Sequence, residues 1–89
     1  MARKMRDTTR YQYIQVFINY TNVLKKYGDD ANYMSKSSLY EKAGKPCGYQ
    51  AQAAGRAIRW VLRLPESEIN RIAIDAEVDR EFLARFINA

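Results

Sequence analysis

The chain has 89 residues and a net charge of +5, with 47% apolar and 28% charged residues, which is typical of one small globular domain. Because it holds no histidine and one cysteine, Cys47, an internal disulfide, a common zinc site and a Ser-His or Cys-His catalytic pair are excluded. No apolar run is long enough to cross a bilayer, so we expect a cytoplasmic protein with no membrane partner, no cofactor and no enzymatic activity.

The positions of N-cap candidates, glycines and prolines along the sequence predict an all-α fold, a small bundle of about five helices. Residues 1–8 form a basic segment that we expect to be a flexible arm, either a solubilising tail or a segment that follows a DNA groove. Residues 9–89 are expected to form a single helical domain that contains a helix-turn-helix.

The first helix is predicted over residues 9–27, with N-cap candidates at Asp7, Thr8 and Thr9 and an end at Gly28. Its apolar residues are too numerous for one stripe, which predicts a central core helix covered on more than one side. An exposed, tyrosine-lined interface is the alternative interpretation of the same residues.

A polar connection over residues 28–32 separates this helix from a short second one. Ser38 and Glu41 have the spacing of a capping box, which predicts a helix that runs to Ala43 and stops at Gly44 and Pro46. A turn then leads into the next helix, at about Gln50. A short helix, a tight connection and a longer basic helix together have the outline of a helix-turn-helix.

The helix predicted over residues 50–63 carries four polar side chains at steps of four, three and four residues, so that they form one stripe: Gln52, Arg56, Arg59 and Arg63. Apolar residues occupy the other side: Ala54, Ala57, Ile58, Val61 and Leu62. No carboxylate lies within four residues of Arg56 or Arg59, so the helix does not neutralise its own charge. This pattern is typical of a helix that binds nucleic acid. An ordinary amphipathic helix with a solvated basic side shows the same pattern.

The end of the chain is acidic. Residues 1–63 carry twelve basic and four acidic side chains, whereas residues 64–89 carry three basic and six acidic ones. Pro65 marks a new helix start, and Asp79 is the N-cap candidate of a last helix. The apolar side of that last helix would serve as core or as the seam of a homodimer: Phe82, Leu83, Phe86 and Ile87.

Residues 39–59 resemble, without a gap, the helix-turn-helix in the DNA-binding effector domain of the sporulation response regulator family of Gram-positive bacteria. The strongest points of likeness are the Leu39-Tyr40 pair, Lys45, the position of the turn, and Arg-Ala-Ile-Arg at 56–59. Two shorter segments show a weaker similarity to that domain. Residues 11–14 are similar to the start of an early helix, and residues 81–84 are similar to its ending.

The resemblance implies an all-helical transcription regulator that self-associates on neighbouring DNA sites and inserts a recognition helix into the major groove. Arg56 falls on a recognition-helix arginine of the family motif, and Gln52 and Ala53 fall where the motif has serine and arginine. Ala53 and Gly55 replace a basic and an acidic residue, so the family's target sequence cannot be carried over. The chain also has no receiver domain to accept a phosphorylation signal.

We therefore predict a double-stranded DNA-binding protein, a transcriptional regulator. Its predicted contacts are Gln52 and Arg56 at base edges, with Arg59, Arg63, Lys42 and Lys45 nearer phosphates, and Gln50 as a further DNA contact. A helical protein-protein module that ignores nucleic acid is the alternative, with helix 1 or the last helix as its interface. RNA binding, with Tyr49 stacking on bases, is a further alternative.

Overall fold

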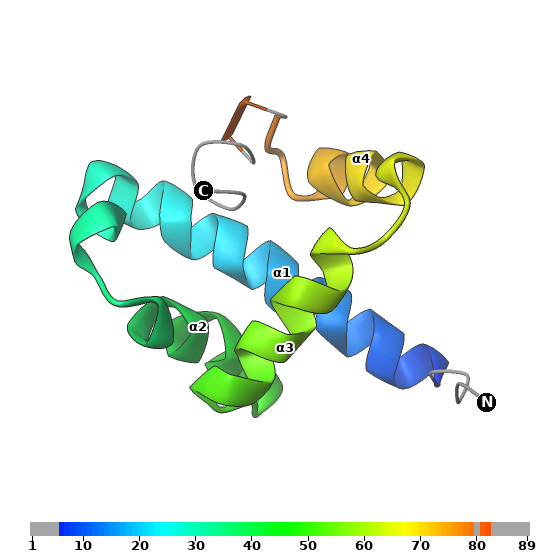
Figure 1. The fold of residues 1–89 in the computed structure, drawn as a ribbon, viewed down its shortest axis with the longest axis horizontal. Helices are drawn as coiled ribbons and strands as arrows, with labels where there is room; N and C mark the ends of the chain where they lie inside the picture. The colour runs from blue at the N-terminus through cyan, green and yellow to red at the C-terminus, as the bar shows by residue number, and fades with distance from the viewer. Residues whose placement is uncertain (1–5, 80, 83–89) are drawn as a thin grey trace.

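The computed structural model describes residues 6–79, 81 and 82, and within that part the fold is all-helical, with no strand (Figure 1). It contains four α-helices: α1 (Asp7–Tyr27), α2 (Lys36–Gly44), α3 (Ala51–Leu62) and α4 (Glu66–Asp75). Two short 3-10 helices join them: η1 (Gly28–Tyr33) and η2 (Lys45–Cys47). The sequence predicts about five helices; the fifth falls on residues 79–89, most of which lie outside the described residues.

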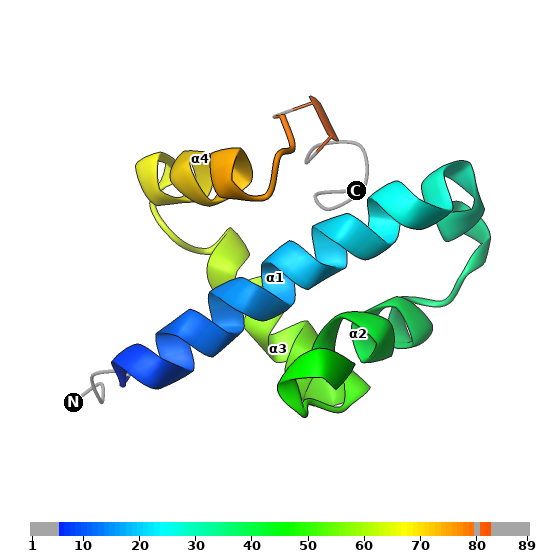
Figure 2. The same cartoon turned by 180° about the vertical axis from the view of Figure 1, so that it is seen from behind.

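The long helix α1 is the centre of the fold, as predicted. In Figures 1 and 2 it runs across the whole molecule, with α2 and α3 on one side and α4 on the other. Its fully covered side chains recur at helical spacing: Val16, Phe17, Tyr20, Thr21 and Leu24. Burying a large apolar side chain stabilises a fold by about 1.5 to 3 kcal/mol. This helix therefore supplies the largest buried side chains, Phe17 and Leu24 among them, and the smaller helices pack against it.

The start of α1 differs from the prediction. The helix begins at Asp7, two residues earlier than expected, and its N-cap residue is Arg6, which makes no side-chain capping bond. It ends where predicted, since the backbone N–H of Gly28 donates to the carbonyl of Leu24. The first two residues of α1 thus lie in the segment assigned to the arm, and residues 1–5 lie outside the described part of the chain.

The start of α2 is a second correction. Ser35 is the N-cap residue, and its hydroxyl oxygen accepts a hydrogen bond from the backbone N–H of Ser38 at 3.1 Å. The predicted capping box at Ser38 and Glu41 is therefore wrong, because Ser38 already lies within the first turn of α2. The polar connection that precedes α2 is not irregular, since residues 28–33 wind into η1.

Helices α2 and α3 approach each other closely at Gly44, the last residue of α2. A Cβ atom at this position would lie 2.8 Å from the Cβ of Ala54 and 2.8 Å from the carbonyl oxygen of Tyr49, which is closer than atoms can pack. The backbone N–H of Tyr49 donates to the carbonyl of Gly44 at 2.9 Å. On the other side of α2, the Asn19 side chain donates to the Ala43 carbonyl at 3.1 Å. Both contacts fix the end of α2 before the chain turns.

The apolar side of α3 is buried as predicted, with Ala54, Ala57, Ile58 and Val61 in the core and Leu62 partly covered. These side chains meet the α1 residues described above. The helix starts at Ala51 with Gln50 as its N-cap residue, and Arg63 directly follows its last turn. The sequence pattern therefore locates α3 to within one residue at each end.

The last described helix, α4, packs Ile72 and Ala73 into the core and carries two acids, Glu66 and Glu68, in its first turn. Lys25 of α1 caps the other end, since its Nζ donates to the carbonyl of Ala76 at 2.6 Å. Beyond α4, the predicted N-cap residue Asp79 accepts a hydrogen bond from the backbone N–H of Phe82 at 2.8 Å.

The apolar side predicted for the last helix is described only in part. Phe82 is half-buried against the core. Leu83, Phe86 and Ile87 lie outside the described residues, so a dimer seam at this position stays a prediction.

The contact at Gly44 gives a first test. We expect Gly44→Ala to lower the free energy of unfolding by about 1 to 3 kcal/mol, because the added methyl group overpacks the α2–α3 contact. This loss should exceed the gain in helix propensity, which is about 1 kcal/mol. Urea unfolding measures the change, with Ser37→Ala on the exposed side of α2 as the control. A Gly44→Ala protein as stable as the wild type would contradict the close approach.

Burial of Tyr20 gives a second test. Desolvation, and then the neighbouring Tyr40, raise the pKa of Tyr20 from 10.0 to about 12. Above pH 10 the unfolded chain loses this proton while the folded chain keeps it. The contribution of Tyr20 to the free energy of unfolding is therefore constant below pH 10 and falls as the pH approaches 12. Relative to Tyr20→Phe, wild-type stability should fall by up to about 1.4 kcal/mol per pH unit in this window. Urea unfolding at several pH values between 10 and 12 measures the free energy of unfolding of both proteins. Curves of this free energy against pH that run parallel for the two proteins would refute the raised pKa of Tyr20.

Candidate nucleic-acid interface

The stripe predicted on α3 faces solvent. Gln52, Arg56, Arg59 and Arg63 are all exposed, while the opposite side of the helix is in the core. Within residues 6–79, 81 and 82 the salt bridge that forms joins Arg10 to Glu68 and involves no member of the stripe. The three arginines are therefore exposed and form no salt bridge with a described carboxylate.

Gln52, near the start of α3, is the centre of this surface. It lines one shallow pocket with Gln50 and Arg56, and a second with Arg59 on the α2 side. A third pocket brings Gln50 and Gln52 together with Lys45. The structure therefore gathers five of the seven predicted contact residues in the three pockets that Gln52 lines.

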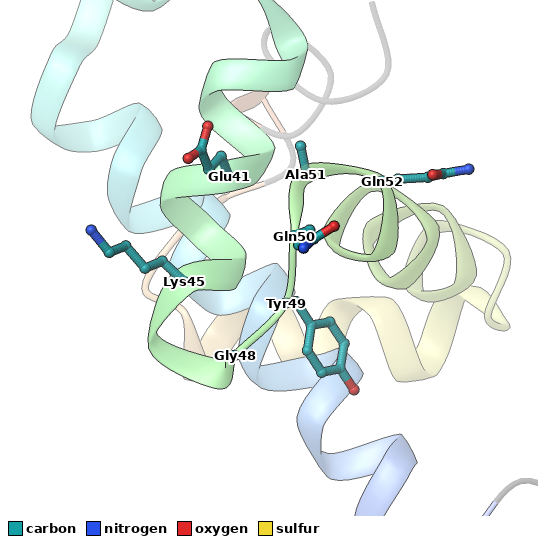
Figure 3. Close-up of a pocket in the computed structure, with 7 residues that line it drawn as sticks. All are labelled: Glu41, Lys45, Gly48, Tyr49, Gln50, Ala51 and Gln52. Atoms are coloured by element: carbon teal, nitrogen blue, oxygen red, sulfur yellow. The ribbon is translucent and has the colours of Figure 1, made fainter.

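Figure 3 shows how the two helices contribute to the third pocket. Gln52 extends from α3 and Lys45 extends the other way from the end of α2, with Gln50 between them. Glu41 of α2 lines the same pocket and brings a carboxylate to it. A negative charge at this position opposes the approach of phosphates, so the pocket is less basic than its lysine and the neighbouring arginines alone would make it.

The two remaining predicted residues lie apart from the gathered five. Arg63 is exposed after the last turn of α3, at the other end of the stripe. Lys42 projects toward α1, where its Nζ lies 5.8 Å from the centroid of the Tyr27 ring. Its place beside α1 separates it from the α3 stripe, because α2 lies between the two.

Aromatic contacts fix one flank of α3 to α1. The ring of Tyr13 meets Trp60 edge to face at 5.6 Å and Tyr49 at 6.2 Å between centroids. The hydroxyl of Tyr49 donates to the side-chain oxygen of Gln12 at 2.9 Å. Partial burial, and then the nearby Tyr13 and Cys47, raise the pKa of the Tyr49 hydroxyl above its ordinary value. Stacking of Tyr49 on an RNA base would require the loss of these contacts.

Gly55 shows why this chain departs from the family motif that residues 39–59 resemble. A Cβ atom here would lie 2.9 Å from the ring of Tyr40, so Gly55 lies under α2 and not on the exposed side. Packing against Tyr40 accounts for the glycine, since a larger side chain would displace that ring.

Sequence reasoning missed two residues that lie next to the predicted set. Ser37 and Tyr40 of α2 line the pocket that also contains Gln52 and Arg59. Ser37 carries no charge and no motif position, and Tyr40 was noted only as part of the Leu39-Tyr40 likeness, not as a contact residue. Only the packing of α2 across Gly55 brings them to the side of the stripe.

Among the described residues no cluster of histidine, cysteine, aspartate and glutamate is suited to hold a metal ion. None of the helices in the described ranges has the length and apolar character that a membrane span requires. No family model, curated protein or solved structure matches this chain.

Proposed function

We propose that this chain binds double-stranded DNA and regulates transcription, with α3 entering the major groove as the second helix of a helix-turn-helix formed by α2, η2 and α3. The observation that carries this proposal is the exposed stripe of Gln52, Arg56, Arg59 and Arg63, whose arginines form no salt bridge within the described residues. An α-helix fits the major groove of B-DNA, where each base pair presents a distinct set of donors and acceptors. The resemblance of residues 39–59 supports the regulatory part of the proposal.

The roles follow from position along α3. Gln52 and Arg56 occupy the N-terminal half of the helix, where side chains of a recognition helix reach base edges. Glutamine pairs well with adenine and arginine with guanine. Arg59 and Arg63 continue the stripe toward the C-terminal end and would contact phosphates, as would Lys45. Lys42 lies beside the Tyr27 ring, outside the three pockets that Gln52 lines, and its phosphate contact stays a prediction.

Rigidity of the presenting helix favours this function. The buried side of α3, the Gly44 contact and the aromatic flank of Tyr13, Trp60 and Tyr49 hold the helix on three sides. A side chain on a fixed helix loses less conformational entropy on binding than one on a mobile loop. The arginines are thus presented from a rigid support.

Substitution of Arg56 tests the proposal. On a preferred duplex, Arg56→Gln should weaken binding by about 1 to 3 kcal/mol and relax selectivity at one base pair, because a bidentate contact to a base is lost. The matched control is Arg71→Gln, which removes an exposed positive charge of α4 and should leave affinity nearly unchanged. Gel shifts at several salt concentrations measure the duplex affinity of both variants.

Two outcomes would count against the proposal. Wild-type protein that ignores duplex DNA at about 50 mM salt would end it, since phosphate contacts are strongest at low ionic strength. Equal losses for Arg56→Gln on preferred and random duplexes would remove base reading from it. The opposite charge change, Glu41→Gln, serves as a further control and should strengthen binding on every sequence.

A further inference from the structure

A second basic cluster lies on the other side of α2 from the α3 stripe. It surrounds an open pocket of about 370 Å³ between the C-terminal end of α1 and the end of α2. Six residues line the pocket: Val23, Lys26, Tyr27, Lys42, Lys45 and Pro46. Two lysines come from the facing helices α1 and α2, and the third begins η2, so the cluster exists only in the folded protein.

Tyr27 organises this pocket, which we call the Tyr27 pocket. The Nζ of Lys26 and the Nζ of Lys42 each lie 5.8 Å from the centroid of its ring. An ammonium group is attracted by the electron-rich face of an aromatic ring. The half-buried ring therefore keeps two like charges close to one point, where repulsion alone would drive them apart.

Within the described residues, none of the three lysines of the pocket forms a salt bridge. The salt bridge found among the described residues joins Arg10 to Glu68. Three acids lie near in sequence: Glu41 on α2, which lines a neighbouring pocket with Lys45, and Asp29 and Asp30 in η1. Each ammonium group offers three N–H donors and no acceptor. The pocket thus presents ammonium donors that form no described salt bridge, beside an apolar surface formed by Val23, Tyr27 and Pro46.

We propose that the Tyr27 pocket binds a phosphate oxyanion. Lysine binds phosphate as a compact point charge, and hydrogen bonds between ionised partners are about twice as strong as neutral ones. The apolar side chains reduce screening by water on one side of the bound group. The phosphate belongs either to a free pyrophosphate-like compound or to a nucleic-acid backbone that reaches the pocket over Lys45, which also lines the α3 interface.

Titration of the full chain with inorganic pyrophosphate tests the site, followed by NMR signals of the Tyr27 ring. We expect saturable shifts, and an affinity reduced by about tenfold or more in Lys26→Gln/Lys42→Gln, because two charged hydrogen-bond donors are lost. The charge-matched control is Lys36→Gln/Arg71→Gln, which removes two exposed cations outside the pocket and should keep most of the affinity. Thermal unfolding followed by circular dichroism verifies that each variant is folded.

Shifts that do not saturate, or an equal affinity for wild type and Lys26→Gln/Lys42→Gln, would overturn the site. A second titration, with Arg56→Gln/Arg59→Gln, separates it from the α3 interface, since that variant should bind pyrophosphate normally. If the wild-type protein fails to bind duplex DNA, the proposed function is wrong. The pyrophosphate titration still shows whether the Tyr27 pocket binds a phosphate oxyanion.

Addition of a random duplex to the pyrophosphate complex identifies the source of the phosphate. Release of pyrophosphate, with a salt slope for duplex binding that is about two units smaller in the lysine variant, assigns the pocket to the nucleic-acid backbone. Retention of pyrophosphate in the presence of duplex assigns it to a free phosphate compound. Either result upholds the site.

Discussion

The close approach of α2 and α3 at Gly44 is the constraint on which the rest of the structure depends. There is no room for a Cβ atom between Gly44, Ala54 and Tyr49, and one backbone hydrogen bond joins Tyr49 to Gly44 across the turn. Small residues continue along the same contact, with Ala43 fully buried and Gly55 under the Tyr40 ring. Because α1 supplies the large core side chains, α2 and α3 can meet through small ones. The orientation of α3, and with it the exposed stripe, follows from this contact.

Separation of charge is the second consequence of the fold. In the acidic first turn of α4, Glu68 pairs with Arg10 of α1, and no salt bridge to an arginine of the stripe forms within the described residues. That pair is 47% and 41% exposed, and such surface ion pairs contribute little stability. Its position matters more than its strength. The basic side chains of α2 and α3 keep their charge, and Lys45 borders both the α3 interface and the Tyr27 pocket.

The features that the sequence predicted well are those decided within one helix. The buried and exposed sides of α3 follow from residue spacing alone, and Gly28 ends α1 where a glycine is expected to. Helix starts were less predictable, because several serines and threonines compete for each N-cap and packing selects among them. Ser35 prevails over Ser38 for this reason.

Features decided between helices could not be predicted. Lys42 has the spacing of a phosphate contact on α2, but its contact with Tyr27 depends on where α1 ends and how η1 turns the chain back. Gly55 gives no sign in the sequence that it faces Tyr40. In both cases the partner is fifteen residues away along the chain, and no periodic pattern records such a pairing. The Tyr27 pocket was missed for the same reason.

Selection of binding sites from a random duplex pool tests most directly the central claim, that α3 reads base pairs from an exposed arginine stripe. Our account predicts that the full chain enriches a defined motif and that Arg56→Gln alters that motif at one position. Recovery of an unenriched pool by the folded wild-type protein would contradict it.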